Sequence, residues 1–505
     1  MKKQIILVTL IGFTTLLGSC KKFVDYNPHD SYLVTALDYL KSASDYQTME
    51  VSVYTPLEWM NQVVPIGEIA SDNAVSGGES ASDVLDLQQI DDFTVNPVNG
   101  SLQQIWQYAY EGINRANYLT SFKQLNPSGT AVTFAGKDAM YGEVYFLRAY
   151  YYFTLVKMFG DVPLFVDKRL DPSSSGKLKR SAKALVYKQI EADLASAISV
   201  LPTVQVQQGR ITKYAAEALL GKVYLYENKY DLAAQTLQPV INSGAFSLVA
   251  DFGSIFLAAG ENGPESVFEI QYTNTSPYYQ WSNPLQGQGN YAVQQNGIRN
   301  LNGNAPMPYA AGWSTNLPTR NLAAAYEAGD QRLAVTVLDI EAYKAANPAF
   351  NITYTVAPYK NTGLYNQKYL PRKGETSGQP ELNYLNNYRI IRYSDVLLMA
   401  AEAYNKSTTA NDGLALGYLN QVRRRAFKAT DGSHDLTAAG ASLYLSILKE
   451  RRLELAMEGD RFFDLVRTGQ AAAVLGANFK AGKNEVFPVP QQEILVSGLT
   501  QNPNY

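Results

Sequence analysis

The chain has 505 residues, of which 46% are hydrophobic and 18% are charged, and its net charge at pH 7 is −3. This is the balance of an ordinary globular protein, and it provides no basic surface field, so we expect no nucleic-acid partner. Tyrosine is abundant, with 36 copies against 19 of phenylalanine and 4 of tryptophan. Because tyrosine combines an apolar ring with a hydroxyl, the excess favours a protein that contacts polar ligands.

The first twenty residues have the pattern of a lipoprotein signal. Lys2 and Lys3 precede an apolar stretch at residues 5–17, and Leu-Gly-Ser then stands before Cys20, the only cysteine. The stretch is too short to span a bilayer as a mature helix and has the length of a signal-peptide core. Small residues before a cysteine fit the narrow subsites of a lipoprotein signal peptidase. We therefore predict a signal peptide at residues 1–19 and acylation, such as palmitate, at Cys20.

Apolar residues recur at three- and four-residue steps in several later segments, which predicts amphipathic helices. The first helix is expected to begin near residue 101. The second, at residues 138–159, is apolar on most sides and is ended by the turn before Pro163. The third, at residues 184–201, is stopped by Pro202.

Residues 212–244 have the spacing of one tetratricopeptide repeat, in which a small residue lets two antiparallel helices approach while large residues fill the groove between them. Asn228 and Lys229 are expected to make the turn. The residues with this spacing are Leu220, Gly221, Tyr224, Tyr230, Ala233, Leu237 and Val240. A second pair is predicted at residues 393–404 and 413–427. Because one repeat cannot bury its own apolar faces, about four helix pairs are expected to stack.

A region of different texture lies between the helical segments. Alternating residues predict a strand at 267–272. Residues 273–319 are rich in Asn, Gly, Pro, Gln and Tyr and have no lasting period. In a compact protein so long a stretch is usually functional or disordered. Its aromatic residues argue against disorder, so we predict ordered loops packed on the helical scaffold.

The charged segment at residues 450–467 admits a catalytic interpretation, because glycoside hydrolases use two carboxylates that flank one bond. Glu450, Glu454 and Glu458, however, lie at four-residue steps on one helix face, where neighbouring arginines can pair with them. We therefore predict a structural ion-pair network. A surface-anchored glycoside hydrolase remains the alternative.

Other catalytic and metal sites lack the residues that they need. Only His29 and His434 occur, so we expect neither a zinc site nor a Ser-His-Asp triad, and no cofactor is predicted. A structural calcium ion is the alternative at one acidic loop, although a solvated loop is favoured because the spacing is not that of an EF-hand. The oxygen-bearing residues of this loop are Asp72, Asn73, Glu79, Asp83 and Asp86.

Several blocks of sequence are distinctive. They read GEVYFLRAYYYF at 142–153, IRYSDVLLMAAEA at 391–403 and ERRLELAMEGDRFFDLVR at 450–467, and the chain closes with QNPNY at 501–505. Together with the cysteine at position 20, they resemble in matching order the SusD/RagB family of outer-membrane lipoproteins.

This resemblance implies a mainly α fold, a tetratricopeptide-like scaffold of helix pairs with long irregular loops and a few short strands. It implies one SusD-like domain at residues 20–505, with N-terminal helices at 20–245, a loop-rich ligand face at 246–380 and C-terminal helices at 381–505. Family members are lipid-anchored in the outer membrane and face the cell exterior. They deliver oligosaccharides, or peptides in the RagB branch, to a SusC-like TonB-dependent transporter and perform no chemistry. A protein-interaction scaffold is a further alternative, because tetratricopeptide repeats commonly bind peptides.

A sugar-binding site needs flat rings that stack on the C–H faces of sugars and polar groups that bond the hydroxyls. Residues 278–283 supply both. The ligand-binding residues predicted from this region are Tyr278, Tyr279, Trp281, Asn283, Tyr291 and Arg299. Asp72 and Asn73 are added from the resemblance alone, because their segment matches one near the family's ligand face. Trp106 lies on an apolar helix stripe and Trp313 resembles a packing position of the family, so both are weaker candidates.

Overall fold

The computed structural model describes residues 36–170, 176, 178–282, 287–356 and 359–505. The predictions for the signal peptide, Cys20, His29 and Asn283 lie outside these residues. The described chain is mainly helical with a few short strands, as predicted. Among the described residues, no helix combines the length and the apolar character needed to cross a membrane.

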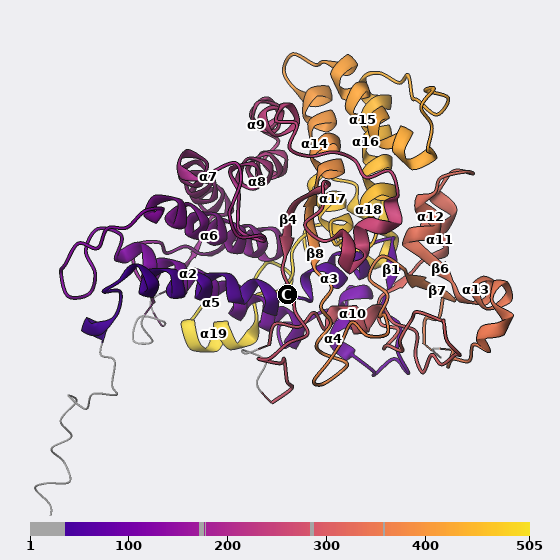
Figure 1. The fold of residues 1–505 in the computed structure, drawn as a ribbon, viewed down its shortest axis with the longest axis horizontal. Helices are drawn as coiled ribbons and strands as arrows, with labels where there is room; N and C mark the ends of the chain where they lie inside the picture. The colour runs from indigo at the N-terminus through magenta and orange to yellow at the C-terminus, as the bar shows by residue number, and fades with distance from the viewer. Residues whose placement is uncertain (1–35, 171–175, 177, 283–286, 357–358) are drawn as a thin grey trace, which may run out of the picture.

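Most helices of the N-terminal half form a layered group on the left of Figure 1. The bounds are α2 (Ala43–Trp59), α3 (Val63–Ile69), α4 (Leu85–Asp91), α5 (Gly100–Ser121), α6 (Lys137–Phe159), α7 (Lys183–Val200), α8 (Lys213–Tyr226) and α9 (Tyr230–Asn242). From α5 to α9, each helix packs against the next one along the chain, and α2 packs against α5. The helix α6 is buried on most of its surface, as an all-round apolar helix requires.

The predicted tetratricopeptide pair is confirmed as α8 and α9. Asn228 makes the turn between them with a φ of +57°. Gly221 is the small residue that allows the close approach, since a Cβ there would lie 2.4 Å from Cδ2 of Leu237. Leu237 is fully buried in return, so the groove between the two helices is filled.

The C-terminal half continues the helical stack. Its helices are α10 (Ala292–Asn296), α11 (Arg320–Ala325), α12 (Arg332–Thr336), α13 (Ile340–Ala346), α14 (Tyr393–Lys406), α15 (Asp412–Phe427), α16 (Gly440–Leu455), α17 (Arg461–Arg467), α18 (Ala471–Leu475) and α19 (Gln491–Ser497). Short 3-10 helices lie at Ala36–Asp38, Phe252–Phe256, Ala258–Gly260, Pro348–Phe350 and Gly476–Asn478. The second predicted pair is confirmed as α14 and α15, and α14 also packs against α9 and α16.

The strands are short and pair two by two. Their bounds are β1 (Ala74–Val75), β2 (Val162–Pro163), β3 (Arg180–Ser181), β4 (Ser266–Ile270), β5 (Leu317–Pro318), β6 (Val337–Asp339), β7 (Leu364–Asn366) and β8 (Tyr388–Arg392). The antiparallel pairs are β1–β5, β2–β3, β4–β8 and β6–β7. The strand predicted at 267–272 is β4, and its partner β8 leads directly into α14.

The predicted ordered loops between β4 and α11 have a small core of their own. A hydrophobic cluster separate from the main helical core lies there, and it takes residues from the loops and from β5, β6 and β7. Its buried members are Ile298, Leu301, Met307, Tyr309, Leu317, Leu338, Ile340, Ile352, Tyr365 and Leu370. The loops are therefore packed segments and not free tails.

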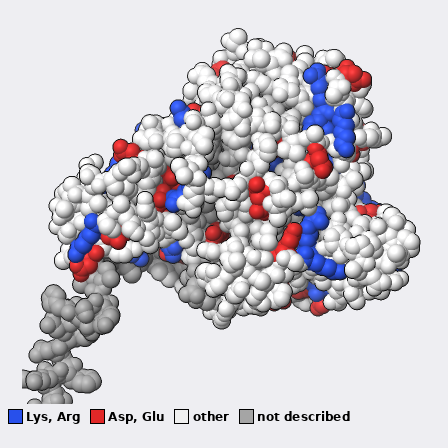
Figure 2. Space-filling view, in the orientation of Figure 1, with Lys and Arg blue, Asp and Glu red and all other residues white. Residues whose placement is uncertain are grey.

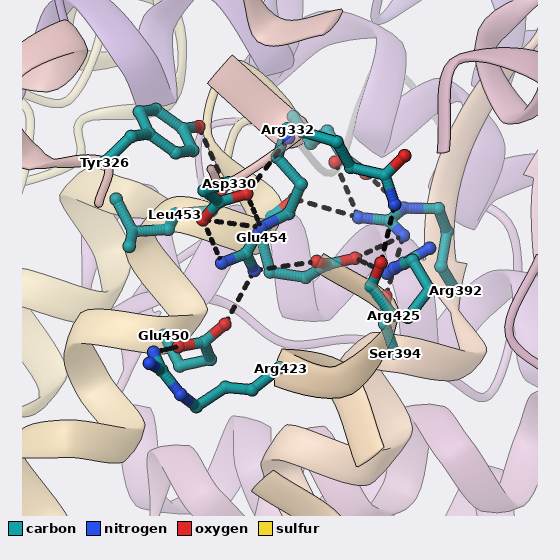
Figure 3. A network of polar contacts seen from close by, with 12 residues as sticks. Tyr326, Asp330, Arg332, Arg392, Ser394, Arg423, Arg425, Glu450, Leu453 and Glu454 are labelled. Carbon is teal, nitrogen blue, oxygen red and sulfur yellow. Dashed lines mark hydrogen bonds and ion pairs between the residues drawn. The ribbon is translucent and has the colours of Figure 1, made fainter. Parts of the chain in front are cut away.

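The acidic residues of α16 lie in the buried ion-pair network that Figure 3 displays. Glu450 and Glu454 are 1% and 0% exposed. Arg332 bonds Oε2 of Glu454 at 3.1 Å, and Arg392 bonds Oε1 at 2.9 Å. Arg425 also bonds Oε1 of this carboxylate. Burial alone would raise the pKa of Glu454, but these guanidinium groups hold it well below its usual range. The network is structural, as predicted, but its cations are not the neighbouring arginines: Arg332 and Arg423 pair with Glu450, whereas Arg451 pairs with Asp395. The helix α16 ends at Leu455, so Glu458 does not lie on the predicted shared helix face.

Candidate functional site

The β4–β8 ribbon brings together two loops that are far apart in sequence. Ile270 at the end of β4 pairs with Tyr388 at the start of β8. The chain therefore leaves β4 into residues 271–282 at the same end of the ribbon where residues 379–387 enter β8. This juxtaposition places the aromatic loop on a fixed base.

Four aromatic rings gather at this base. Tyr279 and Tyr291 lie with ring centroids 5.3 Å apart, and both are buried. Trp281 lies 6.2 Å from Tyr291 and stacks on Trp313 at 6.0 Å with an interplanar angle of 24°. Trp281 is 55% exposed, which is unusual for so large an apolar ring. We call Tyr279, Trp281, Tyr291 and Trp313 the aromatic cluster.

The backbone of the aromatic loop is held by one buried amide side chain. Asn383, which is fully buried, accepts a hydrogen bond from the Tyr279 backbone N–H at 2.7 Å and donates one to the Tyr279 carbonyl at 3.1 Å. A side chain that satisfies both backbone groups of one residue acts as a neighbouring strand would. Tyr279 is thus fixed although no strand pairs with it.

The indole of Trp281 is oriented by an acid from the second loop. Its Nε1–H donates to Oε1 of Glu381 at 3.2 Å. Gln379 donates to the same oxygen at 3.1 Å. The ring is therefore held by a hydrogen bond at its edge and by stacking on one face.

Arg299 ties Trp313 to the acidic loop. Its guanidinium donates to the Trp313 carbonyl at 2.9 Å and forms ion pairs with Glu79 and Asp83, each at 2.9 Å. The Arg299 backbone N–H also donates to Ser314 at 3.0 Å. Through these contacts Arg299 connects the aromatic cluster to the acidic loop.

The hydroxyls of the two buried tyrosines stay protonated. Burial raises the pKa of Tyr279, and it raises that of Tyr291 well above the usual range. At neutral pH both groups can donate hydrogen bonds and neither carries charge. The chemistry that the cluster offers is ring stacking and hydrogen bonding.

The structure brings together some of the predicted ligand residues and separates others. Tyr279, Trp281 and Tyr291 join the aromatic cluster, whereas Arg299 lies behind it. Tyr278 is half-buried and lies against Gly378, where an added Cβ would come 2.7 Å from its ring.

Asp72 and Asn73 belong to another part of the molecule. Asp72 pairs with Arg461 at 2.7 Å and with Arg452 at 2.9 Å. Asn73 is fully buried and bonds Glu68 at 3.0 Å. The polar atoms of these two residues bond other protein groups, and neither residue is in the aromatic cluster.

The residues of the proposed calcium loop are likewise occupied by protein donors. Glu79 and Asp83 take Arg299, and Asp86 accepts from the Ser101 backbone N–H at 3.1 Å. Across the described part of the chain, no group of three or more His, Cys, Asp or Glu side chains is arranged to hold a metal ion.

Trp313 was predicted only as a weaker candidate, and Glu381 and Asn383 were not predicted from the sequence. Trp313 packs, as expected, but it packs on the exposed face of the site by stacking on Trp281. Trp106, by contrast, is 2% exposed and contacts Phe159 in the helical core. The local sequence separates Trp106, on an apolar helix stripe, from Trp313, in a loop, but it does not indicate that Trp313 stacks on Trp281.

The charge on the molecule's surface is balanced locally. Figure 2 shows Lys and Arg side chains lying beside Asp and Glu on the visible face, with wide uncharged areas between them.

Comparison with known proteins gives consistent matches over nearly the whole chain. The family model described as "SusD family" matches residues 264–505, and the model described as "Starch-binding associating with outer membrane" matches residues 22–225. A SusD-like protein of Formosa agariphila is 30% identical over 439 residues, which are 83% of this chain and 83% of that one.

Solved structures match at a similar level. A laminarin-binding SusD-like protein is 35% identical with a TM-score of 0.82, over 92% of this chain and 100% of that one. Surface glycan-binding protein A from Bacteroides thetaiotaomicron, in complex with laminarihexaose, is 28% identical with a TM-score of 0.80, over 92% of this chain and 100% of that one.

Proposed function

The chain belongs to the SusD family, and from this premise we propose that it is a surface lipoprotein that captures glycans and passes them to an outer-membrane transporter. One observation carries the proposal: Trp281, 55% exposed and stacked on Trp313, offers an indole face to the solvent. Such a ring contributes to binding chiefly by covering the C–H face of a sugar.

We propose laminarin-type glucans as the first ligand class to test. The support is that similar solved structures are described as binding laminarin or laminarihexaose. The protonated tyrosines agree with a neutral oligosaccharide.

The anchor and the transporter partner belong to the same proposal. Lipidation at Cys20 would hold the protein at the outer membrane facing outward, and the partner would be a SusC-like TonB-dependent transporter. Radiolabelled palmitate should enter the wild-type protein and not the Cys20→Ala variant. Purification from membranes in mild detergent should recover a TonB-dependent transporter with the wild-type protein.

The proposed function is binding of the glycan without its hydrolysis. Glu450, Glu454 and Glu458 are buried against guanidinium and ammonium groups, so two carboxylates cannot flank a glycosidic bond there. Incubation with laminarin should yield no shorter products by chromatography.

Calorimetric titration of the mature protein with laminarihexaose tests the site. The double variant Trp281→Ala/Trp313→Ala should lose at least about 30-fold in affinity, the usual effect of removing a central aromatic anchor. Tyr444→Ala is the matched control, because that ring lies on α16 beside Lys406, in a different part of the fold. Unchanged affinity of the double variant would exclude the aromatic cluster as the binding site.

A further inference from the structure

Among the described residues, hydrogen-bond donors contact only one of the two carboxylate oxygens of Glu381. Oε1 accepts from Trp281 at 3.2 Å and from Gln379 at 3.1 Å. No described residue donates to Oε2, and no described cation lies within 4.0 Å of this carboxylate. Glu381 is half-buried beside a half-exposed indole, so Oε2 is a hydrogen-bond acceptor at the edge of the aromatic cluster.

The neighbouring charges do not neutralise Glu381. Arg299 is the cation that contacts the Trp313 loop, and it already serves both Glu79 and Asp83. Among the described residues, no cation forms an ion pair with Glu381, and the guanidinium nearest Trp313 is already shared by Glu79 and Asp83.

A free carboxylate oxygen discriminates between ligands by its chemistry. It accepts hydrogen bonds and donates none, and a charge-assisted bond from a hydroxyl is roughly twice as strong as one between neutral groups. Facing a carboxylated or sulfated sugar, it meets a like charge without a donor, which costs affinity.

We infer that Glu381 is the specificity-determining residue of the proposed glycan site: one oxygen positions Trp281, the other accepts a hydroxyl of a neutral sugar, and its charge rejects anionic glycans. The inference rests on the proposed function and adds a defined ligand class to it. It assigns to one side chain both the orientation of the platform and the choice of ligand.

The test compares Glu381→Gln with Glu381→Ala and the wild-type mature protein, using laminarin and laminarin sulfate as a matched neutral and anionic pair. Glutamine keeps an acceptor for Trp281 at the same length and removes the charge. Asp138→Asn is the control, because it removes one exposed charge at the start of α6. Indole fluorescence in each variant reports whether Trp281 keeps its environment.

The wild-type protein should bind laminarin and bind laminarin sulfate at least about tenfold more weakly, with the difference shrinking in roughly 0.5 M salt. Glu381→Gln should lose about tenfold for laminarin, narrow the difference between the two ligands and keep the wild-type fluorescence. Glu381→Ala should lose more affinity and shift the fluorescence. Asp138→Asn should behave as wild type.

Each other result overturns the inference. If the wild-type protein binds laminarin and laminarin sulfate equally well, the site does not reject anionic glycans. If Glu381→Gln binds laminarin with unchanged affinity, Glu381 does not bond a sugar hydroxyl. If the variant loses affinity but discriminates between the two ligands as the wild type does, Glu381 only positions Trp281 and does not determine specificity. Failure of the proposed function gives a different result, because the wild-type protein would then bind neither ligand.

Discussion

The ion-pair network beneath α16 and the aromatic cluster beyond β4 are both rich in functional-looking side chains, but the protein uses them in opposite ways. In the network, Glu454 is fully buried, and both of its carboxylate oxygens bond guanidinium groups. In the cluster, Trp281 is half-exposed and Glu381 keeps an oxygen free. A high density of charge does not by itself mark an accessible site, because the charged groups of the network are buried against one another.

The largest expected effect separates these regions by stability. Glu454→Gln removes the one carboxylate that the buried Arg332, Arg392 and Arg425 share, and breaking these buried pairs should lower the free energy of unfolding by about 3–5 kcal/mol. Urea unfolding measures it. The control is Lys41→Ala, whose pair with Asp38 is exposed and should cost under about 1 kcal/mol. A loss as small as the control's would mean that the network does not stabilise the frame.

The second prediction concerns pH in the helical frame. Burial, and then the neighbouring Glu143, raise the pKa of Glu50 to about 8. Arg210 contacts both carboxylates, at 2.7 Å and 3.2 Å. Because the folded-state pKa lies above that of the unfolded chain, Glu50 contributes stability that is full below about pH 4.5 and is lost as pH rises through about 8.

Between pH 6 and pH 9 the wild-type protein should therefore lose about 2 kcal/mol of unfolding free energy through Glu50. Glu50→Gln should have a flatter profile by urea unfolding, and laminarihexaose affinity at pH 6 to 9 should change much less than stability. Identical profiles for variant and wild type would show that Glu50 is not the titrating group.

A smaller effect tests how the aromatic loop is held. Asn383→Ala removes the side chain that bonds both backbone groups of Tyr279, which should cost about 1–3 kcal/mol locally and weaken laminarihexaose binding roughly tenfold. Hydrogen exchange should increase in residues 271–282 and stay unchanged in α14. Equal protection of the loop in variant and wild type would show that another contact fixes it.

The smallest effect concerns the Arg299 support. Arg299→Lys keeps the charge but cannot bond Trp313, Glu79 and Asp83 together, so affinity for laminarihexaose should fall about threefold. Thermal stability should change little, because Glu79 is largely exposed and solvent screens its pair. A loss as large as that of the Trp281/Trp313 double variant would make Arg299 a ligand contact.

Much of the scaffold could be predicted from the sequence because helices report themselves locally. Gly221 and Leu237 reveal a helix pair by spacing alone, and residues 138–159 carry enough apolar residues to require a buried helix. The carboxylates at 450, 454 and 458 indicate an ion-pair network by their four-residue spacing, but they pair with Arg332, Arg392 and Lys368 from other segments and not with the arginines next to them in sequence. These signals depend on residues within a few turns of each other.

The kinds of residue in the aromatic cluster could be predicted in the same way, but not which distant residues complete it. The sequence by itself determined that rings and amides gather near residues 278–283. Tertiary structure alone decided that Trp313 stacks on Trp281, that Asn383 clamps Tyr279 from 104 positions away, and that Asp72 is bound to arginines elsewhere. The reason is physical: loop contacts are set by how the β4–β8 ribbon joins distant segments, and no period of the local sequence encodes that distance.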